Sequence, residues 1–203
     1  MKSRVAKQNS TNQIQLKTAI GVIAIRWNPK GFLTRIRVLP IGNSKKEPIN
    51  LQSLDDLPLY VGKLLEGLKR YFEYGEPLSE IQWQWIDTKG WTLFQNDVYR
   101  AAALVPHGET RPYAWIARRL NNPQACRAVG QALRKNPLPI LIPCHRIISS
   151  QGHLGGFMGQ EDPNHFKTGI KQKLISIEEN YRNPIFPFLQ GEENQSPVFF
   201  AVG

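Results

Sequence analysis

The residues of this sequence best suited to chemistry are a cysteine and a histidine that follow each other, Cys144 and His145. They stand in the segment Pro143-Cys144-His145-Arg146, at the end of an apolar stretch that three prolines stiffen. The thiolate of cysteine is the nucleophile, yet a free thiol with a pKa of about 8.5 is mostly protonated at neutral pH. Reactivity therefore requires a neighbouring base or positive charge, and His145 and Arg146 supply one of each. Cys144 is a candidate nucleophile.

The spacing of these two residues limits how they can cooperate. Adjacent side chains in an extended segment point to opposite faces, so Cys144 and His145 can act together only across a turn or through a bridging water. We predict that a water molecule bridges the Cys144 and His145 side chains. The alternative is that Cys144 is a small core residue, because free cysteine is among the most buried residue types.

A strongly basic stretch surrounds this segment. The chain carries 26 Lys and Arg against 16 Asp and Glu, a formal net charge of +10. No acidic residue occurs between Glu109 and Glu161, whereas that interval holds Arg111, Arg118, Arg119, Arg127, Arg134, Lys135 and Arg146. The planar fork of arginine suits phosphates and base edges. This charge favours a polyanionic partner, and a merely solvated basic face is the alternative.

Helical patterns lead up to the cysteine segment. Apolar spacing predicts helices over 94–104 and 113–120, and Asn121, Asn122 and Pro123 then supply a turn, an N-cap and a proline at the start of a helix that runs to about residue 135. One face of that helix holds Ala125, Val129, Ala132 and Leu133, and another holds Arg127, Gln131 and Arg134. The pair is typical of a helix-turn-helix, whose second helix commonly enters a DNA groove, although many helical hairpins bind no DNA.

The first 90 residues predict a small sheet with one helix. Alternating, β-branched patterns at 16–27 and 32–39, separated by the turn 28–31, predict a β-hairpin. Helical spacing from 57 predicts a helix that ends near Gly75, and alternation over 81–86 predicts another strand. We place a domain boundary near Gly90, with a loose basic arm at 1–13, a second domain over 91–182 and a tail over 183–203.

Composition excludes several protein classes. With 41% hydrophobic and 21% charged residues, the chain of 203 residues is typical of a folded globular protein. No apolar window is long enough for a membrane-spanning helix, and the first ten residues lack the apolar core of a secretion signal, so we expect no membrane partner and a reducing compartment inside the cell, the cytoplasm or a nucleus. Two cysteines, Cys126 and Cys144, and four scattered histidines predict no metal site, and no nucleotide-cofactor fingerprint is present, so we expect no cofactor.

The cysteine segment resembles the active-site motif of a known family. Pro143-Cys144-His145-Arg146-Ile147 is similar to that of the O6-alkylguanine-DNA alkyltransferases, which reverse alkylation damage in DNA directly. The resemblance extends over about residues 90–180 and keeps the order and spacing of that family's motifs, namely PHGETRPYAWIARRL (106–120), NPQACRAVGQALRKNPLPILIPCHRII (122–148), SQGHLGGF (150–157) and KQKLISIEE (171–179). The sequence before residue 90 is compatible with the family's smaller, variable domain, but no motif there establishes it.

The resemblance implies roles for four residues at the reaction centre. Cys144 would accept the alkyl group, His145 would act as the water-mediated base, and Glu178 would orient the histidine. Asn136 would be the hinge asparagine between the second helix and the cysteine loop. Chemistry agrees with this assignment, because alkyl transfer from a guanine oxygen requires a soft nucleophile and the resulting thioether has a poor leaving group, so each chain would react once.

The resemblance also implies residues that contact DNA and the alkyl group. Arg127 would enter the base stack in place of the flipped nucleotide, Tyr113 would press on the adjacent phosphate, and Ser150 would make a polar contact to base or backbone. We expect further DNA contacts from Asn122, Ala125, Gln131 and Arg134. We expect the alkyl pocket to be walled by Pro139, Ile142, Gly155, Gly156, Phe157, Met158 and Gly159.

We therefore expect an α/β N-terminal domain, a small sheet plus a helix, followed by a mostly helical domain that carries a helix-turn-helix and the cysteine loop. The expected function is repair of double-stranded DNA that contains O6-alkylguanine, by a monomer. Two departures from the family pattern are Cys126, where a small residue is usual before the arginine, and a long connection at 160–169. The alternatives are a non-catalytic lesion sensor of the same fold, which typically lacks the cysteine, and a helix-turn-helix transcription regulator.

Overall fold

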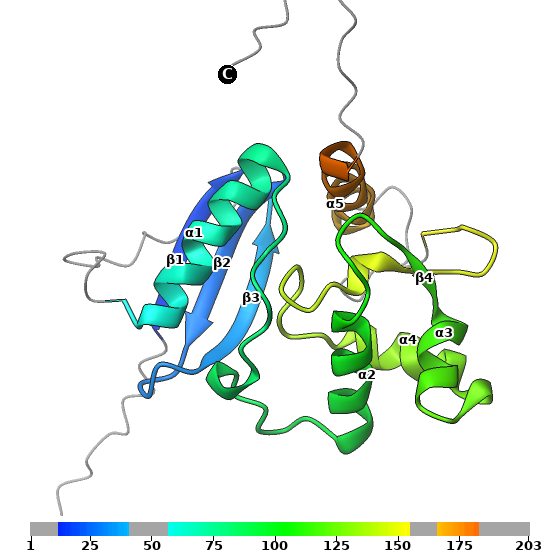
Figure 1. Cartoon of the computed structure of the whole chain (residues 1–203). Helices are drawn as coiled ribbons and strands as arrows, with labels where there is room; N and C mark the ends of the chain where they lie inside the picture. Colours follow the sequence, from blue (N-terminus) through cyan, green and yellow to red (C-terminus); the bar gives the residue numbers. More distant parts are fainter. Residues whose placement is uncertain (1–11, 41–56, 155–165, 183–203) are drawn as a thin grey trace, which may run out of the picture.

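The computed structural model of this protein describes residues 12–40, 57–154 and 166–182. A three-stranded sheet with one helix forms one side of the molecule and a group of helices forms the other (Figure 1). This arrangement confirms the expected fold class, a small N-terminal sheet with a helix followed by a mostly helical part. The arm residues 1–11, the loop 155–165 and the tail 183–203 lie outside the described residues.

The sheet consists of three antiparallel strands in the order β1-β2-β3. They are β1 (Asn12–Thr18), β2 (Gly21–Trp27) and β3 (Leu33–Leu39). The prediction of one continuous strand over 16–27 is wrong, because the Thr18 hydroxyl donates to Gly21 O at 2.8 Å and Gly21 has a φ of 136°, so a tight turn separates two strands. Asn12 and Gln13, which we expected in the loose arm, belong to β1.

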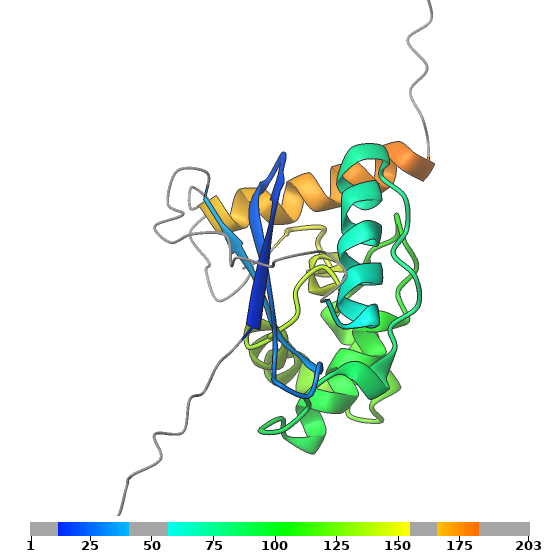
Figure 2. The same ribbon diagram turned by 90° about the vertical axis from the view of Figure 1, so that its left-hand side faces the viewer.

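Helix α1 (Leu59–Tyr74) covers one face of this sheet (Figures 1 and 2). Its buried side chains, Val61, Leu64, Leu65, Leu68 and Tyr71, recur at helical spacing. The helix ends at Gly75, which adopts the left-handed conformation with a φ of 74° and donates its N–H to Tyr71 O. The apolar stripe read from the sequence therefore lies against the sheet.

Residues 81–86, which connect α1 to the helical part, do not form a strand. Residues Trp83–Trp85 form the 3-10 helix η2, and Ile86 makes only an isolated bridge with Leu33. The expected strand over 81–86 is therefore wrong. The free edge of β3 accepts one bond at Leu33 O, from Asp87 N–H at 2.8 Å, and donates another, from Ile36 N–H to Pro137 O at 2.8 Å. Pro137 belongs to a distant part of the chain, so no continuous ladder is left for a fourth strand.

The helical part begins with α2 (Leu93–Ala103), which opens with a capping box between Thr92 and Gln95. Helix α3 (Tyr113–Arg119) and helix α4 (Cys126–Arg134), preceded by the 3-10 turn η3 (Pro123–Ala125), form the expected helical pair. Tyr99 of α2 donates its hydroxyl to Ala132 O of α4 at 3.0 Å, which anchors the pair to α2.

The remaining elements frame the cysteine. The parallel strands β4 (Arg111–Pro112) and β5 (Ile147–Ile148) pair with each other, the 3-10 turn η4 (Cys144–Arg146) precedes β5, and α5 (Phe166–Arg182) packs against η4. Within the described ranges no helix is long and apolar enough to cross a membrane.

Candidate active site

Cys144 begins the 3-10 turn η4, and its sulfur accepts a side-chain hydrogen bond from Asn136. Asn136 Nδ2 donates to Cys144 Sγ at 3.2 Å and to Ile142 O at 2.9 Å, while Asn136 Oδ1 accepts from Leu138 N–H at 3.0 Å. The Asn136 side-chain amide therefore connects the beginning and the end of the loop 136–144 and also bonds to the sulfur. The amide N–H beside the sulfur is a donor, which favours the thiolate over the thiol.

Cys144 is buried, with only 6% of the residue exposed. Burial raises its pKa above the ordinary value, and the Asn136 hydrogen bond and the charge of Lys171 act in the opposite direction without cancelling the effect. At neutral pH the group is therefore a thiol, so a base has to take its proton before the sulfur can act as a nucleophile.

His145, the next residue in the sequence, is the candidate base. In the structure, one nitrogen of its ring makes a hydrogen bond. Its fully buried ring places Nε2 2.7 Å from Glu178 Oε1. Because a carboxylate can only accept, Nε2 carries the proton and Nδ1 keeps its lone pair. Nδ1 is buried and has no hydrogen-bond partner among the described residues. Burial lowers the pKa of His145, so the ring is neutral and Nδ1 is available as a base.

Glu178 lies on α5 and accepts hydrogen bonds from three separate parts of the chain. Its Oε1 accepts from Tyr71 OH at 2.8 Å and Arg146 Nη2 at 3.0 Å, besides His145. Its Oε2 accepts from Arg146 Nε at 2.9 Å and Gly108 N–H at 3.1 Å. Burial alone would raise the pKa of this carboxyl, but the bonds from His145 and Arg146 outweigh it and hold the pKa well below the ordinary value. Glu178 therefore stays a carboxylate.

Lys171 is a site residue that sequence reasoning used only as an alignment marker. Its ammonium group is buried and donates to Ile147 O at 2.6 Å and to Leu154 O. Burial lowers its pKa to about 8, although the nearby Cys144 sulfur opposes this change. Lys171, Leu174 and Glu178 are buried at positions i, i+3 and i+7 of α5. Two charged residues on the apolar stripe of a helix are the signal that could have identified this role.

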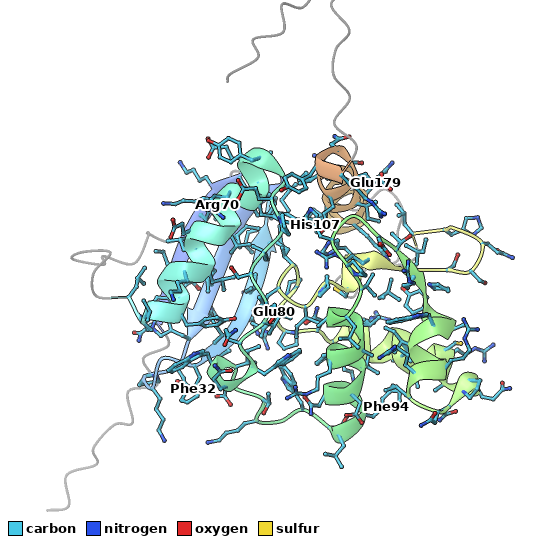
Figure 3. All side chains as sticks on the ribbon, in the orientation of Figure 1. Phe32, Arg70, Glu80, Phe94, His107 and Glu179 are labelled. Carbon is cyan, nitrogen blue, oxygen red and sulfur yellow. The ribbon has the colours of Figure 1, made fainter. Side chains whose placement is uncertain are left out.

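Tyr71 is a second residue of the site that the sequence analysis did not identify. No local pattern in the sequence marks it as different from its neighbours on α1. In the structure its ring also packs edge-on against His107, with the ring centroids 5.8 Å apart. Figure 3 shows His107 between α1 and α5.

The DNA-contact candidates divide between the two faces of α4. Arg127, Gln131 and Arg134 are exposed on one face, as expected from their spacing. Ala125 is only 8% exposed, so its side chain belongs to the core rather than to a surface that could meet DNA. The Asn122 side chain is exposed and makes no capping hydrogen bond, so the expected N-cap interaction is absent there.

The other candidates lie around the same helices. Tyr113 is half-buried at the start of α3, and its ring centroid is 5.9 Å from Lys171 Nζ. Ser150 is exposed in the turn after β5. Of the alkyl-pocket candidates, Pro139 and Ile142 are buried and form a bridge with each other. Gly155, Gly156, Phe157, Met158 and Gly159 lie outside the described residues.

A groove of about 750 Å³ runs beside the site. Its lining includes His107, Pro143 and Arg146, but not Cys144. This groove therefore does not lead a substrate to the sulfur. Among the residues that the structure describes, no cluster of three His, Cys, Asp or Glu side chains could hold a metal ion.

Comparison with known proteins supplies the context for this arrangement. A family model described as the DNA binding domain of 6-O-methylguanine DNA methyltransferase matches residues 93–180. The methylated-DNA–protein-cysteine methyltransferase of Haemophilus influenzae is 35% identical over 148 residues, which cover 72% of this chain and 73% of that protein. The protein of the same name from Methanosarcina mazei is 45% identical over 89 residues, 44% of this chain and 52% of that one, so this chain spans about half the length of that relative.

A solved structure also resembles this one. The crystal structure of Mycobacterium tuberculosis OGT in complex with DNA superposes with a TM-score of 0.64 and 27% identity, over 83% of this chain and 93% of that one. The similarity therefore extends beyond the helical part that the family model matches and includes the N-terminal sheet and α1.

Proposed function

Because this chain belongs to the methylated-DNA–protein-cysteine methyltransferase family, we propose that it repairs DNA by taking the alkyl group of O6-alkylguanine onto Cys144. The observation that carries this proposal is the position of the cysteine sulfur. It is held by Asn136 in the same 3-10 turn as His145, whose Nε2 is bonded to Glu178 and whose buried Nδ1 is unpartnered among the described residues.

The proposed reaction is a single displacement at carbon. His145 Nδ1 takes the proton of the Cys144 thiol through a water molecule, and the thiolate attacks the methyl carbon as the carbon–oxygen bond to guanine breaks. The sulfur–carbon bond that forms is a thioether, and the guanine anion takes up one proton, so the proton lost by the thiol balances the one that guanine gains. Because a thioether does not leave again under these conditions, each chain reacts once.

The protein's electrostatics support this sequence of steps. Glu178 remains ionised and fixes the His145 tautomer, so a positive charge that develops on the ring is stabilised by the carboxylate. Lys171 and the Asn136 amide stabilise the thiolate once it forms. No metal or organic cofactor is needed, because the nucleophile, the base and the stabilising groups all come from this chain.

Reaching the O6 atom requires the damaged nucleotide to leave the base stack. Extrusion costs a few kcal/mol, which contacts from the protein have to offset. We assign this work to Arg127, exposed on α4, which would enter the stack, and to Tyr113, which would press on the adjacent phosphate. Gln131 and Arg134 share the exposed face of Arg127, and Asn122 and Ser150 are exposed nearby in the chain, so double-stranded DNA is the proposed partner of a monomeric protein. We also propose that the protein works in a reducing compartment of the cell, the cytoplasm or a nucleus, because the proposed reaction requires a reduced thiol and a DNA substrate.

Intact-mass measurement tests the proposal. The protein is incubated with a duplex that contains O6-methylguanine, and a gain of one methyl group per chain is expected, mapped to Cys144 by peptide fragmentation. Cys144→Ser should gain nothing while still binding the duplex. Tight binding of the damaged duplex without any gain in mass would instead indicate a lesion sensor, and sequence-selective binding that ignores the lesion would indicate a regulator. Methyl transfer by Cys144→Ser would refute the mechanism.

A further inference from the structure

The N-terminal layer, defined as strands β1–β3 together with α1, reaches the reaction centre at two points. Tyr71 of α1 donates its hydroxyl to Glu178 Oε1 at 2.8 Å. Ile36 of β3 donates its backbone N–H to Pro137 O at 2.8 Å, next to the asparagine that holds the sulfur. One contact therefore lies behind the base and the other beside the nucleophile, although the layer carries neither group.

The end of α1 is fitted closely against α5. A Cβ built on Gly75 would lie 2.9 Å from Tyr181 Cβ and 3.0 Å from Ile177 O, closer than side chains pack. Ile177 immediately precedes Glu178, so this close approach sets the position of α1 at the level of the carboxylate. Tyr71 is fully buried one turn before Gly75. Its hydroxyl therefore has little freedom to leave Glu178.

We propose that Tyr71 is a positioning residue for methyl transfer, whose hydroxyl holds Glu178 Oε1 where that oxygen orients and polarises His145. This inference rests on the proposed function and goes beyond it, because it gives the N-terminal layer a part in positioning the base and not only in supporting the helical part. Burial and the neighbouring carboxylate raise the pKa of Tyr71, so the hydroxyl keeps its proton and remains a donor throughout the working range of pH.

The effect on His145 follows from the sharing of one oxygen. Tyr71, Arg146 Nη2 and His145 Nε2 all donate to Glu178 Oε1. Each additional donor withdraws negative charge from that oxygen and so lowers its pull on the histidine proton. When the Tyr71 hydroxyl is removed, Glu178 stabilises the imidazolium more strongly, and the pKa of His145 rises.

The other titratable groups around this pair remain unchanged by that removal. They are Cys144 and Arg146 from η4, Lys171 from α5 and His107 from the loop after α2. Arg146 and Lys171 are positive and lower the pKa of His145 in both proteins. The difference between the two proteins therefore reports on the Tyr71 hydroxyl.

The test compares Tyr71→Phe with Tyr74→Phe in the full-length chain. The control makes the same change on the same helix at an exposed tyrosine whose hydroxyl bonds only to Glu73 among the described residues. We expect Tyr71→Phe to raise the pKa of His145, followed by NMR, by about half a unit to one unit. The methyl-transfer rate at saturating duplex should fall by about three- to tenfold near neutral pH, because without the hydroxyl Glu178 no longer holds the His145 ring in one position. The acid limb of the pH profile should move up by the same amount as the pKa, because the base is then protonated up to a higher pH. Tyr74→Phe should match the wild type in all three.

The outcomes separate this inference from the proposed function. If the wild type transfers no methyl group, the proposed function fails, while the NMR titration still reports whether Tyr71 tunes His145. If Tyr71→Phe slows transfer but leaves the acid limb and the pKa of His145 in place, Tyr71 is only structural and the inference is wrong. If the variant does not fold, the wild type decides: a hydroxyl proton of Tyr71 that is protected from exchange and lost in Glu178→Gln supports the inference, and a freely exchanging one overturns it.

Discussion

Replacing Glu178 by glutamine exchanges the carboxylate at the centre of the site for an amide of nearly the same shape. Oε1 accepts from Tyr71, His145 and Arg146, and Oε2 accepts from Arg146 and Gly108. A glutamine can offer only one oxygen. Its amide N–H₂ then faces either the Arg146 and Gly108 donors or the Tyr71 and His145 donors, so at least two donors lose their acceptor whichever way the amide turns.

The magnitude follows from the burial of the ion pair. Glu178 is 1% exposed and Arg146 is 11% exposed, so the guanidinium loses its counter-charge in a place that water barely reaches. Removing one partner of a buried pair costs about 3–5 kcal/mol in the free energy of unfolding. For a chain of this size each kcal/mol corresponds to about 2–4 °C in Tm, so we expect a decrease of about 6–20 °C.

The assay is thermal unfolding, with Glu179→Gln as the control. Glu179 is the next residue on α5 and is exposed, so the same change there should leave Tm within about 2 °C. The loss should also depend on pH. Because the folded-state pKa of Glu178 lies below its ordinary value of 4.5, the stability that this carboxylate contributes is present above pH 4.5 and is lost as the pH falls. The difference in Tm between Glu178→Gln and the wild type should therefore become smaller at acidic pH. A Glu178→Gln protein as stable as the control at pH 7, with an unchanged transfer rate, would refute the reasoning.

Three further predictions concern the thiolate, the DNA surface and the histidine. Lys171→Met should lower the methyl-transfer rate at neutral pH and raise the pH at which a small alkylating reagent labels Cys144, because the thiolate loses a nearby cation, while Lys173→Met, exposed on the same helix, should change neither. Arg127→Ala should change the free energy of unfolding by no more than about 0.5 kcal/mol, because the side chain is exposed. It should weaken binding of the damaged duplex, measured by fluorescence anisotropy, more than Lys135→Ala does. Equal losses of affinity in the two variants would mean that Arg127 only contacts phosphates. The pKa of His145 is lowered by burial, so the unfolded chain binds a proton near pH 6.5 that the folded chain does not bind, and the free energy of unfolding from denaturant titrations should fall as the pH drops through 6.5. In His145→Gln that fall should become smaller, and the part that remains comes from His107, whose pKa burial also lowers.

Helical periodicity was the most reliable guide that this sequence offered. The stripes of α1 and α4 read from apolar spacing are buried, and Arg127, Gln131 and Arg134 lie on the exposed face as their spacing predicted. These features depend on the 3.6-residue repeat of a helix, which is a local property of the chain.

The strand predictions failed where a distant segment or a single glycine decided the outcome. Residues 81–86 alternate like a strand, but a bond from Ile36 to Pro137 uses the sheet edge that such a strand would need. The run 16–27 is rich in β-branched and apolar residues, yet the turn before Gly21 divides it. Alternation describes which side chains are buried and does not say whether a partner strand is available.

The sequence by itself determined that a thiol and an imidazole are neighbours in a stiff, basic segment, and the spacing of its motifs was enough to indicate the family. The resemblance implied that Glu178 holds the imidazole, but only the tertiary structure decided which groups hold Glu178. Tyr71 and Gly108 lie 107 and 70 positions from Glu178 in the chain, yet both donate to its carboxylate. Hydrogen bonds of this kind depend on how α1 and the loop after α2 pack against α5. A periodic apolar stripe shows which face of a helix is buried, but it does not show which distant segment that face meets.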